Sequence, residues 1–401
     1  MRSIELFAGA GGLAIGMSNA GFRHAAVVEW NHDACETFRE NQRIHAHSVE
    51  EWPLHECDAR TIDFRTLTSG DIHVVSGGPP CQPFSLGGKH RGNTDTRDMF
   101  PQAVRAVRET GPRAFIFENV KGLLRKSFVD YFEYVSLQLS HPSLIRKRTE
   151  IWQQHRGRLE KHHTAAGSRA EYNVVARLLN AADYGVPQHR ERVFFVGFRA
   201  DLGIKWSFPE PEFSLEALLH DQWVTGDYWR RHRVSPRHRP NAPKHLERKL
   251  LNLATSDDLG AQRPWKTVRD AIFDLPKENS KGPHTFLNHV FWPGARSYAG
   301  HTGSPLDLPA KTLKAGDHGV PGGENMLVNT DGTVRYFTIR EAARLQTFPD
   351  DFVFCGSWSE AMRQLGNAVP VKLAEVVSKS VFSALALANK SAKNPARPIA
   401  N

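Results

Sequence analysis

A cysteine between prolines is the clearest chemical feature of this 401-residue sequence. Cys81 lies in Gly77-Gly-Pro-Pro-Cys-Gln-Pro-Phe-Ser85, directly after the apolar run Ile72–Ser76. A cysteine thiolate is a strong nucleophile. A structural cysteine usually sits within an apolar run, whereas Cys81 follows one, on a stretch stiffened by prolines. The pattern therefore predicts a nucleophile rather than a core residue.

Two further motifs place charged side chains beside apolar runs. Glu118 begins Glu118-Asn-Val120 at the end of Ala114–Phe117, and Arg190 and Arg192 lie in Gln188-His-Arg-Glu-Arg192, before Val193–Phe198. A carboxylate at a strand end can act as a general acid or base, and arginine binds phosphate or a carbonyl. From spacing alone, a surface ion pair for Glu118 and solvated arginines stay open.

A glycine-rich turn near the N-terminus predicts a nucleoside site. It reads Glu5-Leu-Phe-Ala-Gly-Ala-Gly-Gly-Leu13, and Glu29 ends the next apolar run 20 residues after Gly9. Glycines allow a tight turn and close approach of a ligand to backbone amides, and an acid at this distance typically accepts from a ribose hydroxyl. A purely structural turn remains the alternative.

These motifs require parallel strands that all end at one edge of a sheet. Short apolar runs alternate with helical stretches through residue 200, which predicts an α/β fold with helices on both faces. Expected strands are Ser3–Phe7, Ala25–Trp30, Ile72–Ser76, Ala114–Phe117 and Val193–Phe198; expected helices include Asp33–Asn41, capped by Asn31, and Met99–Thr110. In an open α/β sheet, ligands bind outside the carboxyl ends of the strands.

The rhythm of the sequence divides the chain further. We expect a first catalytic and cofactor-binding part over 1–200, a loop-rich domain over 201–334, a return to the catalytic domain over 335–388 and a disordered tail over 389–401. Thr338–Glu341 has the pattern of a helix capping box, and Val371–Ala388 is a predicted final helix.

Composition narrows the class of protein. The net charge of +9 favours a polyanionic partner without requiring one, and 40% hydrophobic residues suffice for a large core. The four cysteines do not form a CxxC pair, so neither a metal site nor a disulfide framework is indicated. The opening residues lack the long apolar core of a signal peptide, so we expect none, and no apolar run approaches membrane length. We expect a cytoplasmic protein.

In order and spacing, the motifs resemble those of the cytosine-5 DNA methyltransferase family, in particular its bacterial restriction-modification members. The resemblance runs through FAGAGG, GGPPCQPFS, ENV, QHRER, Arg335-x-x-Thr338-x-Arg340-Glu341 and GNAVP, Gly366–Pro370. It implies a Rossmann-like sheet that binds S-adenosyl-L-methionine, with a smaller, irregular target-recognition domain. It also implies double-stranded DNA as the substrate, a flipped-out cytosine, and a monomer without an obligate protein partner.

The resemblance assigns roles to particular residues. Cys81 would attack carbon 6 of cytosine, Glu118 would act at ring nitrogen 3, Arg192 would contact the base carbonyl, and Arg190 would contact a phosphate or a loop. The cofactor would bind against Phe7, Gly9, Gly11, Gly12, Glu29, Trp30, Asp58, Pro80, Asn367 and Val369. Trp30 could instead be a core aromatic, and Cys57-Asp-Ala-Arg60 departs from the usual pattern around Asp58.

Three further regions have roles that the sequence leaves open. The Arg- and His-rich segment Trp229–Lys249 is a candidate DNA contact, with a solvated surface as its alternative. The basic stretch Leu139–Arg169 could contact the DNA backbone or form a solvated helix. The segment Phe84–Arg97 could close over the site or be an ordinary flexible loop. The resemblance implies that methylation protects DNA from a restriction endonuclease. Alternatives are an RNA cytosine-5 methyltransferase, a nicotinamide- or flavin-dependent oxidoreductase and an inactive DNA-binding regulator.

Overall fold

The structure is a computed structural model, and it describes residues 1–46, 49, 51–67, 70–80, 98–255, 262–278, 286–298, 302–316 and 325–393. Cys81 and the predicted closing segment Phe84–Arg97 lie outside the described residues. The chain divides into two compact units. The first comprises Met1–Leu179, Glu191–Pro209 and Ala374–Asn401, and the second comprises Asn180–Arg190 and Glu210–Leu373.

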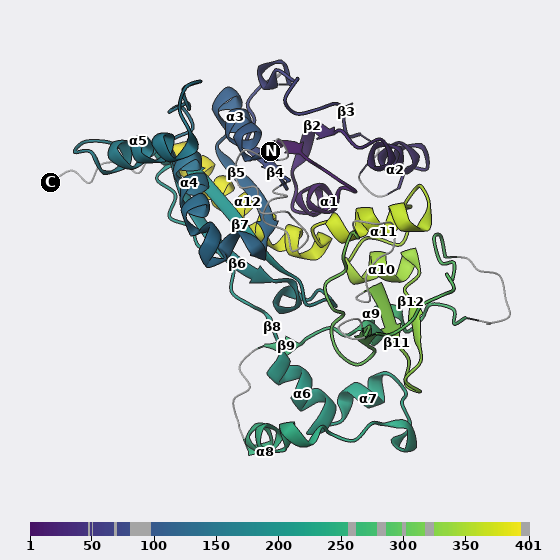
Figure 1. The fold of residues 1–401 in the computed structure, drawn as a ribbon. Coiled ribbons are helices and arrows are strands. Elements are labelled where there is room, and N and C mark those ends of the chain that lie inside the picture. Colours follow the sequence, from purple (N-terminus) through teal and green to yellow (C-terminus); the bar gives the residue numbers. More distant parts are fainter. Residues whose placement is uncertain are drawn as a thin grey trace. The chain divides into compact units, whose positions relative to one another are not determined.

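Within the described residues, the first unit is built on a seven-stranded sheet with the order β3-β2-β1-β4-β5-β7-β6 (Figure 1). The strands are β1 (Arg2–Leu6), β2 (Arg23–Glu29), β3 (Leu54–Glu56), β4 (Val74–Gly77), β5 (Ala114–Val120), β6 (Tyr172–Asn180) and β7 (Glu191–Arg199). All five predicted strands are confirmed, with shifts of one to three residues at their ends.

Strand direction explains why the motifs fall at one edge. β3, β2, β1, β4 and β5 run parallel to one another, and β7 is antiparallel to β5. The strand order changes direction between β1 and β4, which creates the crevice where open α/β sheets bind ligands. The predicted motifs follow β1, β2, β4 and β5, and the antiparallel β7 begins at the same edge. The expected α/β methyltransferase-like sheet is confirmed.

Helices pack on this sheet, and their apolar side chains form a buried core with those of the strands. They are α1 (Gly12–Asn19), α2 (His32–Arg43), α3 (Phe100–Thr110), α4 (Val129–Ser140), α5 (Trp152–Thr164) and, from residue 374 on, α12 (Val371–Lys393). The predicted cap of α2 is confirmed, because the Asn31 side chain accepts from the Ala34 amide. The buried cluster includes Phe100, Phe115, Phe117 and Phe195 from α3, β5 and β7, so apolar burial holds this helix against the sheet.

The C-terminal helix α12 packs on the first unit. Phe382 meets Phe22 edge to face with ring centroids 5.2 Å apart, and Trp206 donates to Ser380. The helix extends to Lys393, five residues beyond the predicted end, into the segment expected to be a disordered tail. No helix in the described part of the chain is long and apolar enough to cross a membrane.

The second unit consists of short elements. Its helices are α6 (Leu215–Trp223), α7 (Asp227–Arg231), α8 (Glu247–Thr255), α9 (Val268–Ile272), α10 (Ile339–Leu345) and α11 (Trp358–Asn367). Its strands are β8 (Phe213–Ser214), β9 (Arg263–Pro264), β10 (Ser304–Pro305), β11 (Met326–Val328) and β12 (Val334–Tyr336). The capping box of α10 is confirmed: Thr338 accepts from the Glu341 amide, and Glu341 from the Thr338 amide. The functional domain boundaries stay a prediction.

Glu5 is an acid buried inside β1, and it should make stability depend on pH. Its side chain accepts a hydrogen bond from Ser76, and burial raises its pKa to about 8 from the usual 4.5, although this hydrogen bond opposes the shift. An acid whose pKa is raised on folding favours the folded state below the unfolded pKa. That contribution is lost as pH rises from about 4.5 to about 8.

We therefore expect Glu5→Gln to be more stable than the native protein at pH 8, by roughly 2 to 4 kcal/mol. The difference should shrink toward pH 5, where Glu5 is protonated in both states. Urea unfolding at several pH values measures both proteins. An identical pH slope in the two proteins would show that Glu5 does not titrate in this interval.

Candidate active site

The glycine-rich turn after β1 and the cysteine motif after β4 lie close together at the carboxyl edge of the sheet. β1 pairs with β4, and Leu6 is the partner of Gly77. A Cβ built on Gly77 would lie 2.3 Å from the Leu6 carbonyl oxygen, so only glycine permits this approach. The turn after β1 and the segment Gly78–Pro80 therefore leave the sheet side by side.

Glu29, the last residue of β2, binds the turn after β1 and the start of the segment after β2. One of its oxygens accepts from the Gly9 amide at 2.7 Å, and the other accepts from the Trp30 and Asn31 amides at 2.9 and 2.8 Å. The side chain is only 5% exposed. A carboxylate has about four acceptor positions, so three amides leave capacity for a further donor. This arrangement is compatible with the predicted contact to a ribose hydroxyl.

The residues of the turn after β1 differ in backbone conformation and in the atoms that surround them. Phe7 has a left-handed φ of 55°, which is uncommon for a large side chain, so the chain turns sharply there. Gly11 also has a positive φ of 84°, and a Cβ on it would lie 2.8 Å from the Phe38 ring. A Cβ on Gly9 would meet no atom of the described residues within 4 Å, and Gly12 begins α1. Among these residues there is thus open space beside the Gly9 backbone.

Trp30 is 69% exposed. The alternative that it is a core aromatic is therefore wrong. Its position next to Glu29, with an exposed ring, suits packing against a planar ligand group such as adenine. That contact stays a prediction.

Asp58 has a partner that the sequence did not suggest. Its carboxylate accepts from the Arg60 amide at 2.8 Å and forms an ion pair with the Arg60 guanidinium at 2.5 Å. The hydrogen bond from Arg60 is the main cause that lowers the pKa of Asp58. An adenine amino group would have to share this carboxylate with Arg60. Asp58 remains the least supported of the cofactor predictions.

Glu118 and Arg192 form the charged pair of the site. The Arg192 Nε atom lies 2.8 Å from Glu118 Oε1, and the side chains are 12% and 9% exposed. Val120 of β5 is the register partner of Arg192 in β7, so Glu118 lies diagonally across the antiparallel pair. Burial lowers the pKa of Arg192, although the Glu118 charge opposes this shift.

The carboxylate of Glu118 also faces the cysteine motif. A Cβ built on Gly78 would lie 3.3 Å from Glu118 Oε2. The structure thus brings Glu118, Arg192 and the segment before Cys81 together, whereas Cys81 itself is not described. The open alternative of a surface ion pair for Glu118 is wrong, because the pair is buried.

Asn119 is a functional candidate whose role the sequence did not reveal. Its side-chain amide donates to the Pro79 carbonyl at 2.9 Å, and its side-chain oxygen accepts from the Val120 amide. Asn119 thereby ties the end of β5 to the segment that leads to Cys81. The Pro80 carbonyl accepts from the Met99 amide at 3.1 Å, which holds the same segment from the other side. The available signal was an asparagine directly after the candidate acid.

Arg190 belongs to the second unit and is fully buried there. Its guanidinium donates to the carbonyls of Leu313, Gly366 and Ala368 at 3.0, 2.8 and 2.9 Å. The expected phosphate contact has no exposed surface through which to form, and the structure gives Arg190 the loop contact instead. One side chain therefore joins the QHRER motif, Leu313 and the GNAVP motif.

The same contacts fix the last two predicted cofactor residues. Asn367 is exposed and lies between the two GNAVP carbonyls that Arg190 binds, and Val369 is 6% exposed. Gly366 is required sterically, because a Cβ there would lie 2.3 Å from the Ala315 amide nitrogen. Arg190 therefore presents Asn367 on a rigid turn. Contact of Asn367 or Val369 with a cofactor stays a prediction.

The sequence matches the model of a family described as C-5 cytosine-specific DNA methylase over residues 1–141 and 150–383. The chain belongs to this family. It is a DNA cytosine-5 methyltransferase, so the RNA, oxidoreductase and inactive-regulator alternatives are not favoured. A cysteine, an acid and an arginine in family order account for motifs that the oxidoreductase alternative leaves unexplained.

Relatives of known class agree with this assignment. The chain is 29% identical to the Type II methyltransferase M.NgoMIV of Neisseria gonorrhoeae, over 96% of this chain and 97% of the relative. It is 32% identical to the Type II methyltransferase M.Eco47II of Escherichia coli, over 96% and 80%. The S. pombe Dnmt2 methyltransferase structure has the same fold, with a TM-score of 0.54 at 17% identity over 97% of this chain and 99% of that chain.

The family match clarifies the basic stretch Leu139–Arg169. Only residues 142–149 fall between the two matched ranges. Arg156 forms ion pairs with Asp130, Glu133 and Glu160, and Arg158 with Glu150. These arginines connect α4, α5 and the loop before α5, so they stabilise the fold. The exposed basic residues of the stretch that stay available to DNA are Arg146, Lys147, Arg148, Lys161 and Arg169.

Proposed function

We propose that this DNA cytosine-5 methyltransferase uses S-adenosyl-L-methionine and the nucleophile Cys81 to methylate one short sequence of double-stranded DNA. The observation that carries the proposal is the buried Glu118–Arg192 pair beside the segment that leads to Cys81. A charged pair at the carboxyl end of two strands suits a heteroaromatic ring that must gain and lose charge. The target cytosine must leave the duplex to reach it.

The reaction needs three groups of this chain. The Cys81 thiolate adds to carbon 6, and the electron pair of the 5,6 double bond becomes available at carbon 5. Glu118 supplies or holds the proton at ring nitrogen 3, which neutralises the charge that addition creates. Arg192 donates to the base carbonyl and keeps Glu118 oriented. Once carbon 5 carries the transferred methyl group, a base removes the carbon 5 proton, and the bond from Cys81 to carbon 6 breaks as the double bond returns.

The cofactor proposal rests on the turn after β1. S-adenosyl-L-methionine supplies an electrophilic methyl group when it is bound. Glu29 would accept from the ribose hydroxyls, Trp30 would pack on the adenine, and the open side of Gly9 would admit the methionine part. The remaining predicted contacts are Phe7, Gly11, Gly12, Asp58, Pro80, Asn367 and Val369. Arg190 acts as a positioning residue for Asn367.

The relatives M.NgoMIV and M.Eco47II are Type II methyltransferases, which supports a biological role of the same kind. We propose that methylation protects DNA from a cognate restriction endonuclease and that residues 201–334 recognise the target. The enzyme acts on duplex DNA as a monomer, without an obligate protein partner.

Label transfer tests the proposed function. Purified protein is incubated with methyl-labelled S-adenosyl-L-methionine and either unmethylated duplex DNA or transfer RNA, and the nucleic acid is digested to nucleosides. We expect label in 5-methyldeoxycytidine from DNA, confined to one sequence. Label on an exocyclic amino group, or on RNA alone, would contradict the proposal.

A further inference from the structure

The Arg- and His-rich segment Trp229–Lys249 contains arginines that differ in how they are held. Arg230 binds Asp227 and donates to the Thr225 carbonyl at 3.0 Å. The Arg239 Nε atom donates to the Val234 carbonyl at 3.2 Å. These side chains stabilise their own turn, so they are poor candidates for contact with a base.

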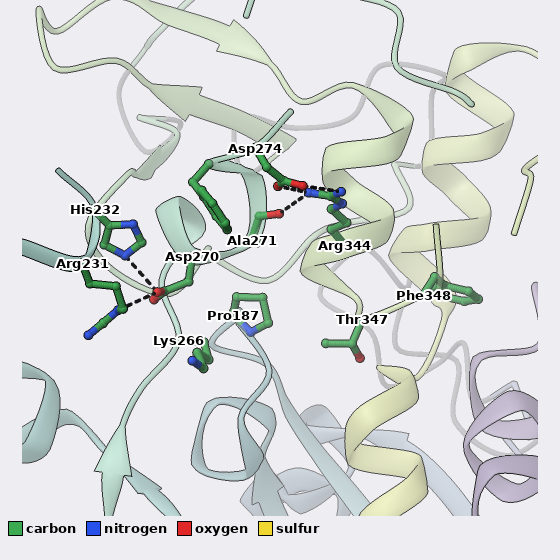
Figure 2. A pocket seen from close by; sticks show the side chains of 11 residues that line it. Pro187, Arg231, His232, Lys266, Asp270, Ala271, Asp274, Arg344, Thr347 and Phe348 are labelled. Atoms are coloured by element: carbon green, nitrogen blue, oxygen red, sulfur yellow. Dashed lines mark hydrogen bonds and ion pairs between the residues drawn. The ribbon is translucent and has the colours of Figure 1, made fainter. Parts of the chain in front are cut away.

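The next two side chains are held at the wall of a pocket of about 560 Å³ in the second unit (Figure 2). Arg231 binds Asp221 at 3.1 Å and lies 3.7 Å from Asp270, and the His232 ring lies 2.9 Å from the same Asp270 carboxylate. Figure 2 shows both side chains converging on Asp270. Arg231 could not turn toward DNA without leaving the Asp221 carboxylate unpaired, and His232 would give up its contact with Asp270.

Arg233 differs from these neighbours. Its side chain is exposed, and among the described residues it makes no hydrogen bond or ion pair. Its backbone has a left-handed φ of 53°. The Val234 amide donates to the Trp229 carbonyl at 2.9 Å across this residue, which is the hydrogen bond of a helix end where glycine is usual. An arginine is strained where glycine would not be.

The helix that precedes Arg233, α7, is firmly packed. Tyr228 and Trp229 of α7 are 0% and 2% exposed and pack with Leu218 of α6. The Tyr228 hydroxyl lies 2.9 Å from the Thr267 hydroxyl and donates to Asp307 at 2.8 Å, and the Trp229 ring nitrogen donates to the Gln222 carbonyl at 2.7 Å. Helices α6 and α7 pack against each other (Figure 1). A rigid backbone fixes the point from which the Arg233 side chain extends.

We propose that Arg233 is a specificity-determining residue that contacts a guanine edge in the major groove of the target sequence. The inference rests on the proposed function, because it names a residue for the recognition that function requires. Arginine is well suited to guanine because its two parallel donors match the two acceptors of that base. A strained, exposed and unpaired arginine on a fixed turn combines the properties that base recognition needs.

If Arg233 only stabilised the C-terminal end of α7 by its charge, lysine should replace it without loss of base preference. Positive charge near a helix C-terminus is favourable, and lysine would preserve that effect but lose the paired donors. Arg237 is the matched control: it is exposed, lies four residues further on and has no left-handed φ. We expect Arg237 to contact phosphate, which affects all sequences alike.

The experiment compares the native protein with Arg233→Lys, Arg233→Gly, Arg233→Ala and Arg237→Gln. Each protein methylates a pool of duplex DNA with random sequence around cytosine, and bisulfite sequencing gives the relative kcat/KM for every base at every position. Thermal unfolding of each variant is measured in parallel, because Arg233→Gly relieves the backbone strain and should unfold at a higher temperature than Arg233→Ala.

The expected result is a local loss of base preference. The lysine and glycine variants should lose about 10-fold or more of their discrimination at one guanine position, with the other positions unchanged. Arg237→Gln should lower kcat/KM equally for all sequences. An unchanged preference, or a uniform loss with the Arg233 variants, would overturn the inference. A native protein that methylates no sequence in the pool would contradict the proposed function as well.

Discussion

Replacing Glu118 by glutamine should lower kcat for methyl transfer by about 10²- to 10⁴-fold, the usual contribution of a positioned acid or base. An amide cannot supply the proton that ring nitrogen 3 needs as Cys81 adds. Binding of S-adenosyl-L-methionine should be unchanged, since Glu118 lies on β5 and the cofactor turn follows β1. Single-turnover label transfer measures the chemical step.

The same substitution leaves a buried Arg192 without its charge partner, which costs on the order of 3 kcal/mol of folding free energy. The double variant Glu118→Gln with Arg192→Gln removes both charges, so it should regain part of the stability but none of the activity. Glu191→Gln is the matched control, because Glu191 is the neighbouring acid and binds Lys121 at the surface. Recovery of activity in the double variant would show that Glu118 has only a structural role.

The Glu29→Ala variant should raise the Kd for S-adenosyl-L-methionine by about 100-fold. Hydrogen bonds to a charged group contribute roughly 1.5–3 kcal/mol, and Glu29 would lose its ribose contact together with its hold on the Gly9 amide. Glu29→Gln should have a smaller effect, because the glutamine side-chain oxygen can still accept a hydrogen bond from one of these backbone amides. Isothermal titration measures the Kd of each variant.

Two comparisons separate cofactor contact from general damage. Trp30→Ala should raise the Kd about 10-fold with little change in stability, because an exposed ring contributes little to folding. Glu36→Gln should change neither quantity, since Glu36 binds Arg39 on the surface of α2. If Glu29→Ala binds the cofactor as tightly as the native protein, the turn after β1 is not the ribose site.

Local sequence patterns predicted the sheet and the position of the site. A parallel strand buried on both faces is a short apolar run, which is why Ala114–Phe117 could be located. Because the carboxyl ends of such strands share an edge, Glu29 and Glu118 could be assigned to one crevice before their contacts were known. The strand ends shifted because polar residues such as Glu118 and Asn119 continue β5.

Contacts between distant residues could not be predicted. Nothing local to Arg190 indicates that it binds carbonyls of residues 313, 366 and 368. The basic stretch was predicted from its own charges, whereas two partners of Arg156 lie on the preceding helix. The left-handed backbone of Arg233 likewise depends on how α7 ends.

Covalent trapping of Cys81 tests the central claim most directly. A duplex that contains 5-fluorocytosine at the target position is incubated with methyl-labelled S-adenosyl-L-methionine, because fluorine at carbon 5 cannot leave as a proton does. We predict a stable, labelled protein–DNA adduct with the native protein, attached through Cys81, and no adduct with Cys81→Ser. An adduct that persists in Cys81→Ser, or methylation of ordinary DNA by that variant at the native rate, would contradict the account.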